Sequence, residues 1–474
     1  MPKDSKIVII GSGVFGISAA YHLAKEQYQN IKVFDKGDYD NNKFNPLQGA
    51  TGASTDFNKL VRASYVEKVH YQNLALESLA VYYEWNKQLK SAAFLPEGLT
   101  NDDLIFKNTG YVRLDDYPNN EEERTLANFS KQGLRAYEYD INDPEDIERS
   151  KITGWYSKID PLNQKGTVKT LSGVLDSIAG VANADKALLW MKYLCERTGN
   201  VDFIYGPRAG SVSKIVYSSE TPEKVVGIET ADGKYYPADY VIVAAGGWTP
   251  QLLPSKNQER LESVGSTFIC VQIPHDRQDL LEKYKNFPMV NWKLTFEGNL
   301  RKDGVYMFPA TDDGIIKIGA NDHFWRYLTG NDKGILSVPN TDFKLLPLES
   351  LNTYKKFFRQ WLGDLSNAGV KIEKSRYRFS AVGQHNEFVI DFIPGHSNLI
   401  VSSGGGFHGF KFLPIIGRFV EGLISGKDYK YAEFFKFDSI PKKDYDIELV
   451  KDQANPYALN SVKFVDRKTD YFDL

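Results

Sequence analysis

Lys317 is the residue whose setting most directly suggests chemistry. It lies in the run Gly314-Ile-Ile-Lys-Ile-Gly319, which alternates as a β-strand does, so its side chain faces away from Ile316 and Ile318. An ammonium group turned into a low-dielectric interior would stabilise negative charge that develops during a reaction. Strand lysines also commonly face solvent, and the sequence leaves both orientations open. Tyr306, in the preceding strand, could line the substrate side of such a site.

Further basic residues lie in two other segments. Lys59 and Arg62 follow a loop of small residues, and arginine is well suited to bind a carboxylate through two hydrogen bonds. His408 and Lys411 lie at the glycine turn 404–409, beside the expected start of a helix. A helix end can stabilise negative charge on a bound ring. His408 could equally cap the helix, and Lys411 could be a surface cation.

The start of the chain predicts a scaffold for these residues. Lys6–Ile10 is typical of a buried strand, and Gly11-Ser-Gly-Val-Phe-Gly16 supplies the G-x-G-x-x-G spacing before a helical run and a second strand, Ile31–Phe34. The first glycine permits a tight turn, the second lets the backbone approach a pyrophosphate, and the third lets the helix pack on the strand. Asp35 ends the second strand, where it can accept hydrogen bonds from ribose hydroxyls. This order of parts predicts a dinucleotide site.

Two later glycine turns, residues 245–247 and 404–409, also follow apolar strands. A nicotinamide enzyme usually needs only the first turn, so three close approaches of the backbone favour a bulkier cofactor, FAD rather than NAD. Lys317 would then stand where dioxygen gains an electron. The residues expected to bind the cofactor are Gly11, Ser12, Gly13, Val14, Phe15, Gly16, Asp35, Lys36, Ser54, Thr55, Asn58, Lys59, Ala245, Gly246, Trp248, Gly406, Phe407, His408, Gly409, Phe410 and Lys411.

Composition excludes several classes of protein. The 474 residues carry a formal net charge of −3, which argues against a general nucleic-acid binder. Cys195 and Cys270, the two cysteines, support neither a disulfide framework nor a cysteine-rich metal site. No apolar run is long enough to cross a membrane, and the ending Tyr471-Phe-Asp-Leu474 is not a peroxisomal address. We therefore expect a cytoplasmic monomer without metal, membrane or nucleic-acid partners.

The order of the segments predicts an α/β fold with two domains. We expect a Rossmann-type FAD-binding domain made of residues 1–85, 173–260 and 386–440. A second, β-rich substrate domain would comprise residues 86–172 and 261–385, and residues 441–474 would form a C-terminal extension. The cofactor domain is then assembled from segments that are discontinuous in the sequence.

Six segments together carry a resemblance to a known family. They are Gly11–Gly16, Asp56-Phe-Asn-Lys-Leu-Val-Arg62, Ala244-Ala-Gly-Gly-Trp-Thr249, Gly314-Ile-Ile-Lys317, Phe388-Val-Ile-Asp391 and His408-Gly-Phe-Lys-Phe-Leu-Pro-Ile-Ile-Gly417. The chain resembles the FAD-dependent amine oxidases of the monomeric sarcosine oxidase family and, more closely, the amadoriases (fructosyl amino acid oxidases). The resemblance runs nearly end to end and implies a glutathione-reductase-like or D-amino-acid-oxidase-like architecture.

The resemblance also implies a reaction. Such enzymes take a hydride from the carbon next to a secondary amine, the resulting imine hydrolyses, and dioxygen reoxidises the flavin to give hydrogen peroxide. By resemblance, Lys317 matches the lysine that activates oxygen, and Lys411 matches a lysine beside flavin and substrate. Lys59 matches a residue that reaches the flavin. With Tyr306, these are the expected catalytic residues.

The chain departs from the family pattern at four places. Ser380 stands where the family usually attaches FAD through a cysteine, so we expect FAD without a covalent link. Asn321 and the adjacent Asp322 stand where amadoriases carry a glutamate for the sugar. The segment Phe434–Asp438 replaces a segment with a carboxylate-binding arginine, and Phe407 replaces a glycine. Arg62, Asn321 and Asp322 are the expected substrate-binding residues.

The sequence thus predicts an oxidase of N-substituted amino acids, with a small-molecule amine and dioxygen as its partners. The substrate could be a fructosyl amino acid or a related amine of the saccharopine, pipecolate or sarcosine type. A FAD dehydrogenase that uses another electron acceptor, and a flavin-binding protein without turnover, remain the alternatives.

Overall fold

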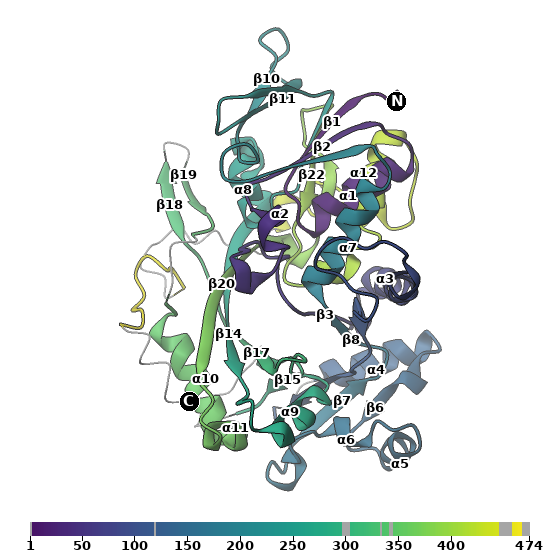
Figure 1. Ribbon diagram of the computed structural model, residues 1–474, viewed down its shortest axis with the longest axis vertical. Coiled ribbons are helices and arrows are strands. Elements are labelled where there is room, and N and C mark those ends of the chain that lie inside the picture. The colour runs from purple at the N-terminus through teal and green to yellow at the C-terminus, as the bar shows by residue number, and fades with distance from the viewer. Residues whose placement is uncertain are drawn as a thin grey trace.

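The computed structural model describes residues 2–117, 120–295, 304–331, 334–340, 345–444 and 457–466. Its first layer is a six-stranded sheet in the order β21-β22-β13-β1-β2-β9 (Figure 1). All neighbours in this sheet are parallel except β21 and β22. The strands are β1 (Lys6–Ile10), β2 (Asn30–Asp35), β9 (Val201–Tyr205), β13 (Tyr240–Val243), β21 (Val389–Phe392) and β22 (Leu399–Ser403).

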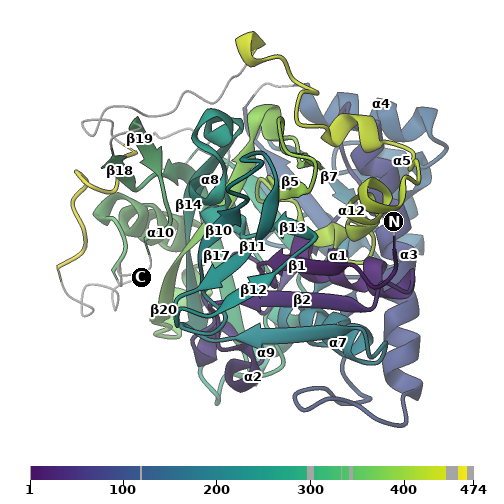
Figure 2. The same cartoon turned by 90° about the horizontal axis from the view of Figure 1, so that it is seen from above.

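Both faces of this sheet are covered. Residues of α1 (Val14–Lys25), α7 (Ala184–Glu196) and α12 (Gly417–Ser425) share one apolar core with one face of β1 and β2. The other face packs against a three-stranded sheet of β10 (Val212–Tyr217), β11 (Val225–Thr230) and β12 (Tyr235–Pro237). Figure 2 shows β1 and β2 side by side next to α1. Burial on both faces explains why β1 is apolar at every position after Lys6.

The second layer is an eight-stranded sheet in the order β20-β14-β17-β16-β15-β5-β7-β6, which lies below the first in Figure 1. Its strands are antiparallel except for the pair β15 and β5. They are β5 (Tyr111–Asp115), β6 (Glu138–Asp140), β7 (Ser172–Asp176), β14 (Leu261–Gln272), β15 (Met289–Lys293), β16 (Val305–Met307), β17 (Ile315–Trp325) and β20 (Ile372–Gly383).

Alternation along these strands separates an apolar face from a polar one. On β17, Ile316 and Ile318 belong to the core beneath α10 (Leu348–Trp361), so Lys317 between them points to the opposite face. Likewise, Val290 and Trp292 of β15 lie in that core. The opposite face of this sheet therefore carries the side chains that can form a site.

The remaining elements connect and cover the two sheets. They are α2 (Tyr39–Asn42), α3 (Val69–Ser91), α4 (Glu121–Lys131), α5 (Pro144–Ile152), α6 (Tyr156–Ile159), α8 (Thr249–Leu252), α9 (Gln278–Lys285), α11 (Gly363–Asn367), β3 (Lys59–Val61), β4 (Phe106–Lys107), β8 (Gly180–Ala182), β18 (Leu328–Asn331) and β19 (Gly334–Ser337). No helix among the described residues is both long enough and apolar enough to cross a membrane.

The expected α/β class, with a Rossmann-type domain and a β-rich domain, is confirmed. The six-stranded sheet draws on residues 6–35, 201–243 and 389–403, and the eight-stranded sheet on residues 111–176 and 261–383. One local expectation was wrong. The helix expected beside Lys411 begins only at Gly417, because Pro414 lacks an N–H, and Lys411 lies in a short 3-10 turn instead.

Candidate active site

A cavity of about 310 Å³ opens at the carboxyl ends of the parallel strands. It extends from Asp35 and Lys36 past the first glycine turn to Arg378, Ser380 and Phe407. Fourteen residues expected to bind the cofactor line it: Gly11, Gly13, Val14, Phe15, Asp35, Lys36, Ser54, Lys59, Ala245, Gly246, Trp248, Phe407, Gly409 and Phe410. Ser12, Gly16, Thr55 and Asn58 line neither this cavity nor the second one, which Gly406, His408 and Lys411 line.

The first glycine turn has the close contacts that its spacing predicts. Gly11 has a φ of +108°, and a Cβ there would lie 2.4 Å from the carbonyl oxygen of Ala244. A Cβ on Gly16 would lie 1.8 Å from the carbonyl oxygen of Gly11. Only glycine therefore allows α1 to start so close to the strands. The helix N-terminus, with Gly13 as its N-cap, faces the cavity with the positive end of the helix dipole.

Asp35 and Lys36 form the far end of this cavity. Asp35 accepts hydrogen bonds from the backbone N–H groups of Ser12 and Gly37, both at 2.8 Å. Burial raises the pKa of Asp35, whereas these two hydrogen bonds act to lower it. The Lys36 ammonium lies 3.9 Å above the ring of Trp248. A carboxylate at the end of β2 and a helix N-terminus beside it fit the ribose and pyrophosphate of a dinucleotide.

The second cavity, of about 530 Å³, adjoins the first. Lys59, Arg378, Phe407 and Phe410 line both cavities, so a cofactor in the first can present one end to the second. Phe407 has a left-handed backbone, with a φ of +65°, and its exposed ring stacks on Phe324 at 5.5 Å. Lys317, Tyr306 and Lys411, three of the expected catalytic residues, also line the second cavity.

Asp56 is the centre of a buried charge cluster at the boundary of the two cavities. Its Oδ2 accepts hydrogen bonds from Lys317 Nζ at 2.8 Å, from Arg378 Nη1 at 2.9 Å and from Lys59 Nζ at 3.0 Å. Lys317, only 1% exposed, also donates to the Asn58 carbonyl at 2.7 Å. One carboxylate thus serves three cationic side chains, which leaves the cluster with an excess of positive charge.

This crowding shifts the pKa values in the cluster. Burial lowers the pKa of Lys317 to about 8, assisted by Arg378 and opposed by Asp56. Burial and Arg378 hold the pKa of Lys59 well below its ordinary value. Although burial alone would raise it, the pKa of Asp56 lies below its ordinary value because of these cations. Lys317 therefore combines a buried ammonium with a pKa near the physiological range.

Lys411 belongs to a second hydrogen-bonded group. Its Nζ donates to the His408 carbonyl at 2.7 Å and to the Tyr65 hydroxyl at 3.1 Å. Burial lowers the pKa of His408, which is then neutral, and its Nε2–H must donate to the Asn386 carbonyl at 3.2 Å. His408 Nδ1 therefore accepts from the Tyr65 hydroxyl at 3.0 Å, and the Tyr65 oxygen accepts from Lys411. Burial and the nearby Arg62 lower the pKa of Lys411 well below its ordinary value.

Arg62 and Lys411 are the basic side chains that line the second cavity without a carboxylate partner among the described residues. The Arg62 guanidinium lies 4.6 Å over the Tyr65 ring and donates to the Ser64 carbonyl. It is thus oriented by local contacts yet keeps an unpaired charge in the cavity.

Two other expectations concern β17 and the cysteines. The backbones of Asn321 and Asp322 belong to β17, but their side chains lie outside the described residues. Ser380 lines the first cavity, whereas both cysteines are buried elsewhere and line neither cavity. Burial raises the pKa of Cys270 to about 12 and that of Cys195 still further, so both thiols are unreactive.

Sequence reasoning missed three members of the site. Arg378 lines both cavities and hydrogen-bonds Tyr306, Asp56 holds the cations together, and Tyr65 joins Lys411 to His408. Arg376, Arg378 and Ser380 alternate along one strand, and this was the available signal for Arg378. The sequence contained no comparable signal for Tyr65, which meets its partners only through the tertiary fold.

The chain is similar to several known proteins. A family model described as "FAD dependent oxidoreductase" matches residues 6–423. L-saccharopine oxidase of Schizosaccharomyces pombe is 26% identical over 433 residues, with 89% of this chain and 90% of that protein covered. Monomeric sarcosine oxidase of an Arthrobacter species is 25% identical over 434 residues, with 90% and 94% covered. A modified fructosyl peptide oxidase structure from Aspergillus nidulans has a TM-score of 0.77 at 21% identity, with 98% of this chain and 99% of that chain covered.

Proposed function

Because this chain belongs to the family of FAD-dependent oxidoreductases, we propose that it oxidises N-substituted amino acids and uses dioxygen as the electron acceptor. The resemblance seen in the motifs is confirmed by the relatives, which include oxidases of sarcosine, saccharopine and N-methyl-L-tryptophan. The observation that carries the proposal is the buried Lys317–Asp56–Arg378–Lys59 cluster where the two cavities meet.

FAD, when bound, accepts a hydride from the substrate and returns electrons to dioxygen. The residues that would hold it are those of the first cavity: the N-terminus of α1 for the pyrophosphate, Asp35 for the ribose and the shared wall for the ring. Ser380 lies on this wall, and no cysteine does, so we propose that FAD is held without a covalent bond.

Arg62 and Lys411 act on different groups of the substrate, its carboxylate and its amine. The unpaired guanidinium of Arg62 is suited to bind the substrate carboxylate. Burial and Arg62 lower the pKa of Lys411, which favours the neutral amine. The two N–H groups of this amine are donated, one to Tyr65 and one to His408. Its remaining lone pair can accept the proton of a secondary ammonium group, which must become a neutral amine before it can lose a hydride.

Lys317 and its cluster supply electrostatic stabilisation. An excess of buried positive charge favours negative charge on the bound ring and on oxygen as it gains an electron. Tyr306 fixes Arg378 on the substrate side of this cluster.

An anaerobic reduction screen tests the proposal. Purified protein with bound FAD is mixed without oxygen with sarcosine, pipecolate, saccharopine and fructosyl lysine, and bleaching of the flavin absorbance is followed. We expect at least one compound to bleach the flavin and, on admission of air, to yield hydrogen peroxide. Bleaching followed by slow reoxidation in air would instead indicate a dehydrogenase with another acceptor. A flavin that none of the amines reduces would contradict the proposal.

Two further properties stay predictions. We expect a monomer in sedimentation velocity experiments and a cytoplasmic location in cell fractionation.

A further inference from the structure

The floor of the second cavity is the polar face of the eight-stranded sheet. Register places Lys317, Phe308, Met289 and Tyr111 in one row across four neighbouring strands. Tyr306, Asn291 and Arg113 form the next row. Beyond that row, Lys293 continues the same face of β15, and it too lines the cavity. The cavity thus follows the strands away from Lys317.

This register sets the length of the cavity. Lys293 lies four residues beyond the row of Lys317, or about 13 Å along the strands, and two strands to the side, or about 10 Å. A methyl group on the substrate amine would leave this far end empty. The cavity therefore fits an amine with an extended substituent.

The far end carries three polar groups. Lys293 Nζ forms an ion pair with Glu121 Oε2 at 2.7 Å, and both side chains line the cavity. Close by on β15, the Oδ1 atom of Asn291 is buried without a hydrogen-bond partner. If this ion pair served only to attach α4 to the sheet, the oxygen beside it would be expected to have a hydrogen-bond partner, as most buried polar atoms do. The far end therefore offers an ammonium, a carboxylate and an amide oxygen.

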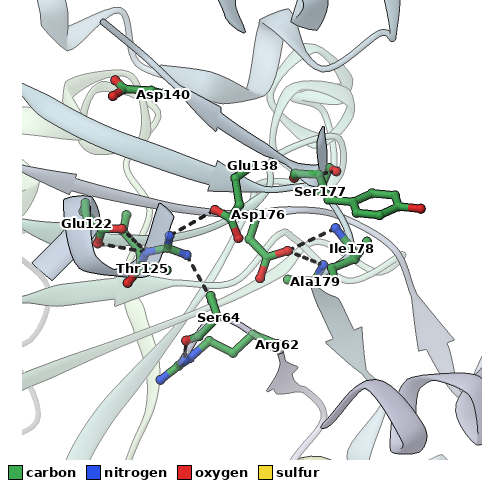
Figure 3. Close-up of polar contacts among 12 residues, drawn as sticks. Arg62, Ser64, Glu122, Thr125, Glu138, Asp140, Asp176, Ser177, Ile178 and Ala179 are labelled. Carbon is green, nitrogen blue, oxygen red and sulfur yellow. Dashed lines mark hydrogen bonds and ion pairs between the residues drawn. The ribbon is translucent and has the colours of Figure 1, made fainter. Parts of the chain in front are cut away.

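Arg113, although it lines the same end, is already paired with two carboxylates. It donates to both oxygens of Glu122 at 2.9 and 2.7 Å, to Glu138 at 3.3 Å and to Ser64 at 3.1 Å. Figure 3 shows Glu122, Glu138 and Asp176 gathered in this network, with Arg62 pointing away from it. Anion binding at the far end thus falls to Lys293.

These groups fit one kind of substituent. A free ammonium can lie between Glu121 and the Asn291 oxygen, while a carboxylate beside it meets Lys293. A substituent with an alkyl end would remove water from the charges of Lys293 and Glu121 without forming hydrogen bonds in its place. A substituent that ends in a carboxylate alone would be repelled by Glu121 and by the Asn291 oxygen. A group with both charges on one carbon satisfies all three residues.

We infer that Lys293, Glu121 and Asn291 form a subsite for a zwitterionic α-amino acid head, joined by an aliphatic chain to the amine that is oxidised. This inference rests on the proposed function and narrows it to substrates with two amino acid ends. Glu121 and Lys293 act here as specificity-determining residues, at a distance from the reacting atoms.

Four compounds with a common N-carboxymethyl amine test this subsite. Nε-(carboxymethyl)lysine carries the zwitterionic head, N-pentylglycine ends in a methyl group, and N-(5-carboxypentyl)glycine and N-(5-aminopentyl)glycine each carry one charge. We expect kcat/KM for flavin reduction to be at least about tenfold higher for the zwitterion than for each of the others. Values within about twofold of one another would overturn the subsite.

Binding measurements separate this inference from the proposed function. If none of the four compounds reduces the flavin, the proposed function fails for this class, but calorimetric titration still ranks their affinities. Tighter binding of the zwitterion by at least about tenfold would then support the subsite, and equal affinities would overturn it.

Variants assign the preference to these residues. Lys293→Met and Glu121→Gln should each reduce the preference for the zwitterion to within about twofold. The exchanged pair Glu121→Lys with Lys293→Glu retains an ion pair and should lose the preference as well. Lys285→Met, which removes a lysine from an exposed pair with Asp312, should retain it. Flavin content and Tm verify that each variant is folded, and a preference that survives in a folded Lys293→Met protein would refute the assignment.

Discussion

At the scale of single residues, the site depends on Lys317 having a counter-ion without being neutralised. Asp56 holds it at 2.8 Å but shares the same oxygen with Lys59 and Arg378. A lone buried ammonium would lose its proton, and a simple ion pair would cancel its charge. The shared carboxylate retains a cation that can act on a neighbouring charge.

Replacing Lys317 with Met should therefore affect the two half-reactions differently. Reoxidation of reduced FAD by dioxygen should slow by about 100-fold or more, because a buried charge that stabilises the electron transfer is lost. Reduction by substrate should change little, and Asp56 keeps two cationic partners. Stopped-flow absorbance measures both steps. The exposed Lys214→Met variant serves as a control. Equal losses in both half-reactions would contradict the role of Lys317.

The pKa of about 8 for Lys317 predicts a pH dependence of the oxygen reaction. Protonated Lys317 is the active form, so the rate constant should be highest below pH 8 and fall as the pH rises through that value. Asp56 stays ionised throughout, because its pKa lies below the ordinary range. Reduced enzyme mixed with oxygenated buffer between pH 6 and pH 10 gives the profile. A wild-type profile that is flat, or one that Lys317→Met still shows, would exclude this assignment.

At the scale of the elements, the glycine turn controls how α1 meets β1. Gly16→Ala should destabilise the fold by about 1–3 kcal/mol and reduce flavin content, because its Cβ would collide with the Gly11 carbonyl. Gly363→Ala, at the start of α11 where nothing lies within 4 Å of a Cβ, should change stability by less than about 0.5 kcal/mol. Urea denaturation and the flavin absorbance of purified protein measure both effects. Full flavin content with unchanged stability in Gly16→Ala would disprove the packing argument.

The network around Arg113 links three strands to the loop that carries Ser64 (Figure 3). Burial, together with Asp176, raises the pKa of Glu138, and Arg113 opposes this. Arg113→Met should cost about 3–5 kcal/mol of unfolding free energy, because it leaves buried carboxylates without their cation.

A matched control for Arg113 is Arg124→Met, which breaks an exposed pair with Glu67. This change should cost less than about 1 kcal/mol. Similar denaturation midpoints for the two variants would show that the Arg113 network is dispensable.

Local signals explain what the sequence could predict and what it could not. The first strand, its glycine turn and Asp35 are consecutive, so their order alone predicts the dinucleotide site. Alternation placed Lys317 on the face opposite its isoleucine neighbours but could not tell which face was buried. The meeting of Lys317 and Arg378 on Asp56 depends on the order of β20, β14 and β17, which no local pattern records. No local pattern indicates the strand β6, because its acidic residues are typical of a surface loop.

At the scale of the whole molecule, the cofactor cavity joins distant segments. Its wall includes Ile10–Gly11, Ser211–Val212, Ala244–Trp248, Arg378 and Gly405. A ligand that contacts all of these segments stabilises the folded state by mass action, by about 2.7 kcal/mol when its concentration is 100 times Kd.

Removal of FAD should therefore be reversible and should lower the stability of the protein. Acid precipitation should release yellow FAD into the supernatant, as expected without a covalent bond. Apoprotein prepared under milder conditions should have a lower Tm that rises with added FAD, and riboflavin, which lacks the pyrophosphate and adenosine, serves as the control ligand. Flavin that stays with the acid-precipitated protein would contradict the non-covalent assignment.

The spread of this cavity along the chain has a consequence for biosynthesis. Phe15 and Phe410 line the same wall, so a nascent chain cannot complete the binding surface until residues through Phe410 have left the ribosome. Cofactor uptake is then a late event in the maturation of the polypeptide. In cells starved of riboflavin, proteases should degrade the full-length apoprotein faster than the mature enzyme, because the ligand that joins these segments is absent.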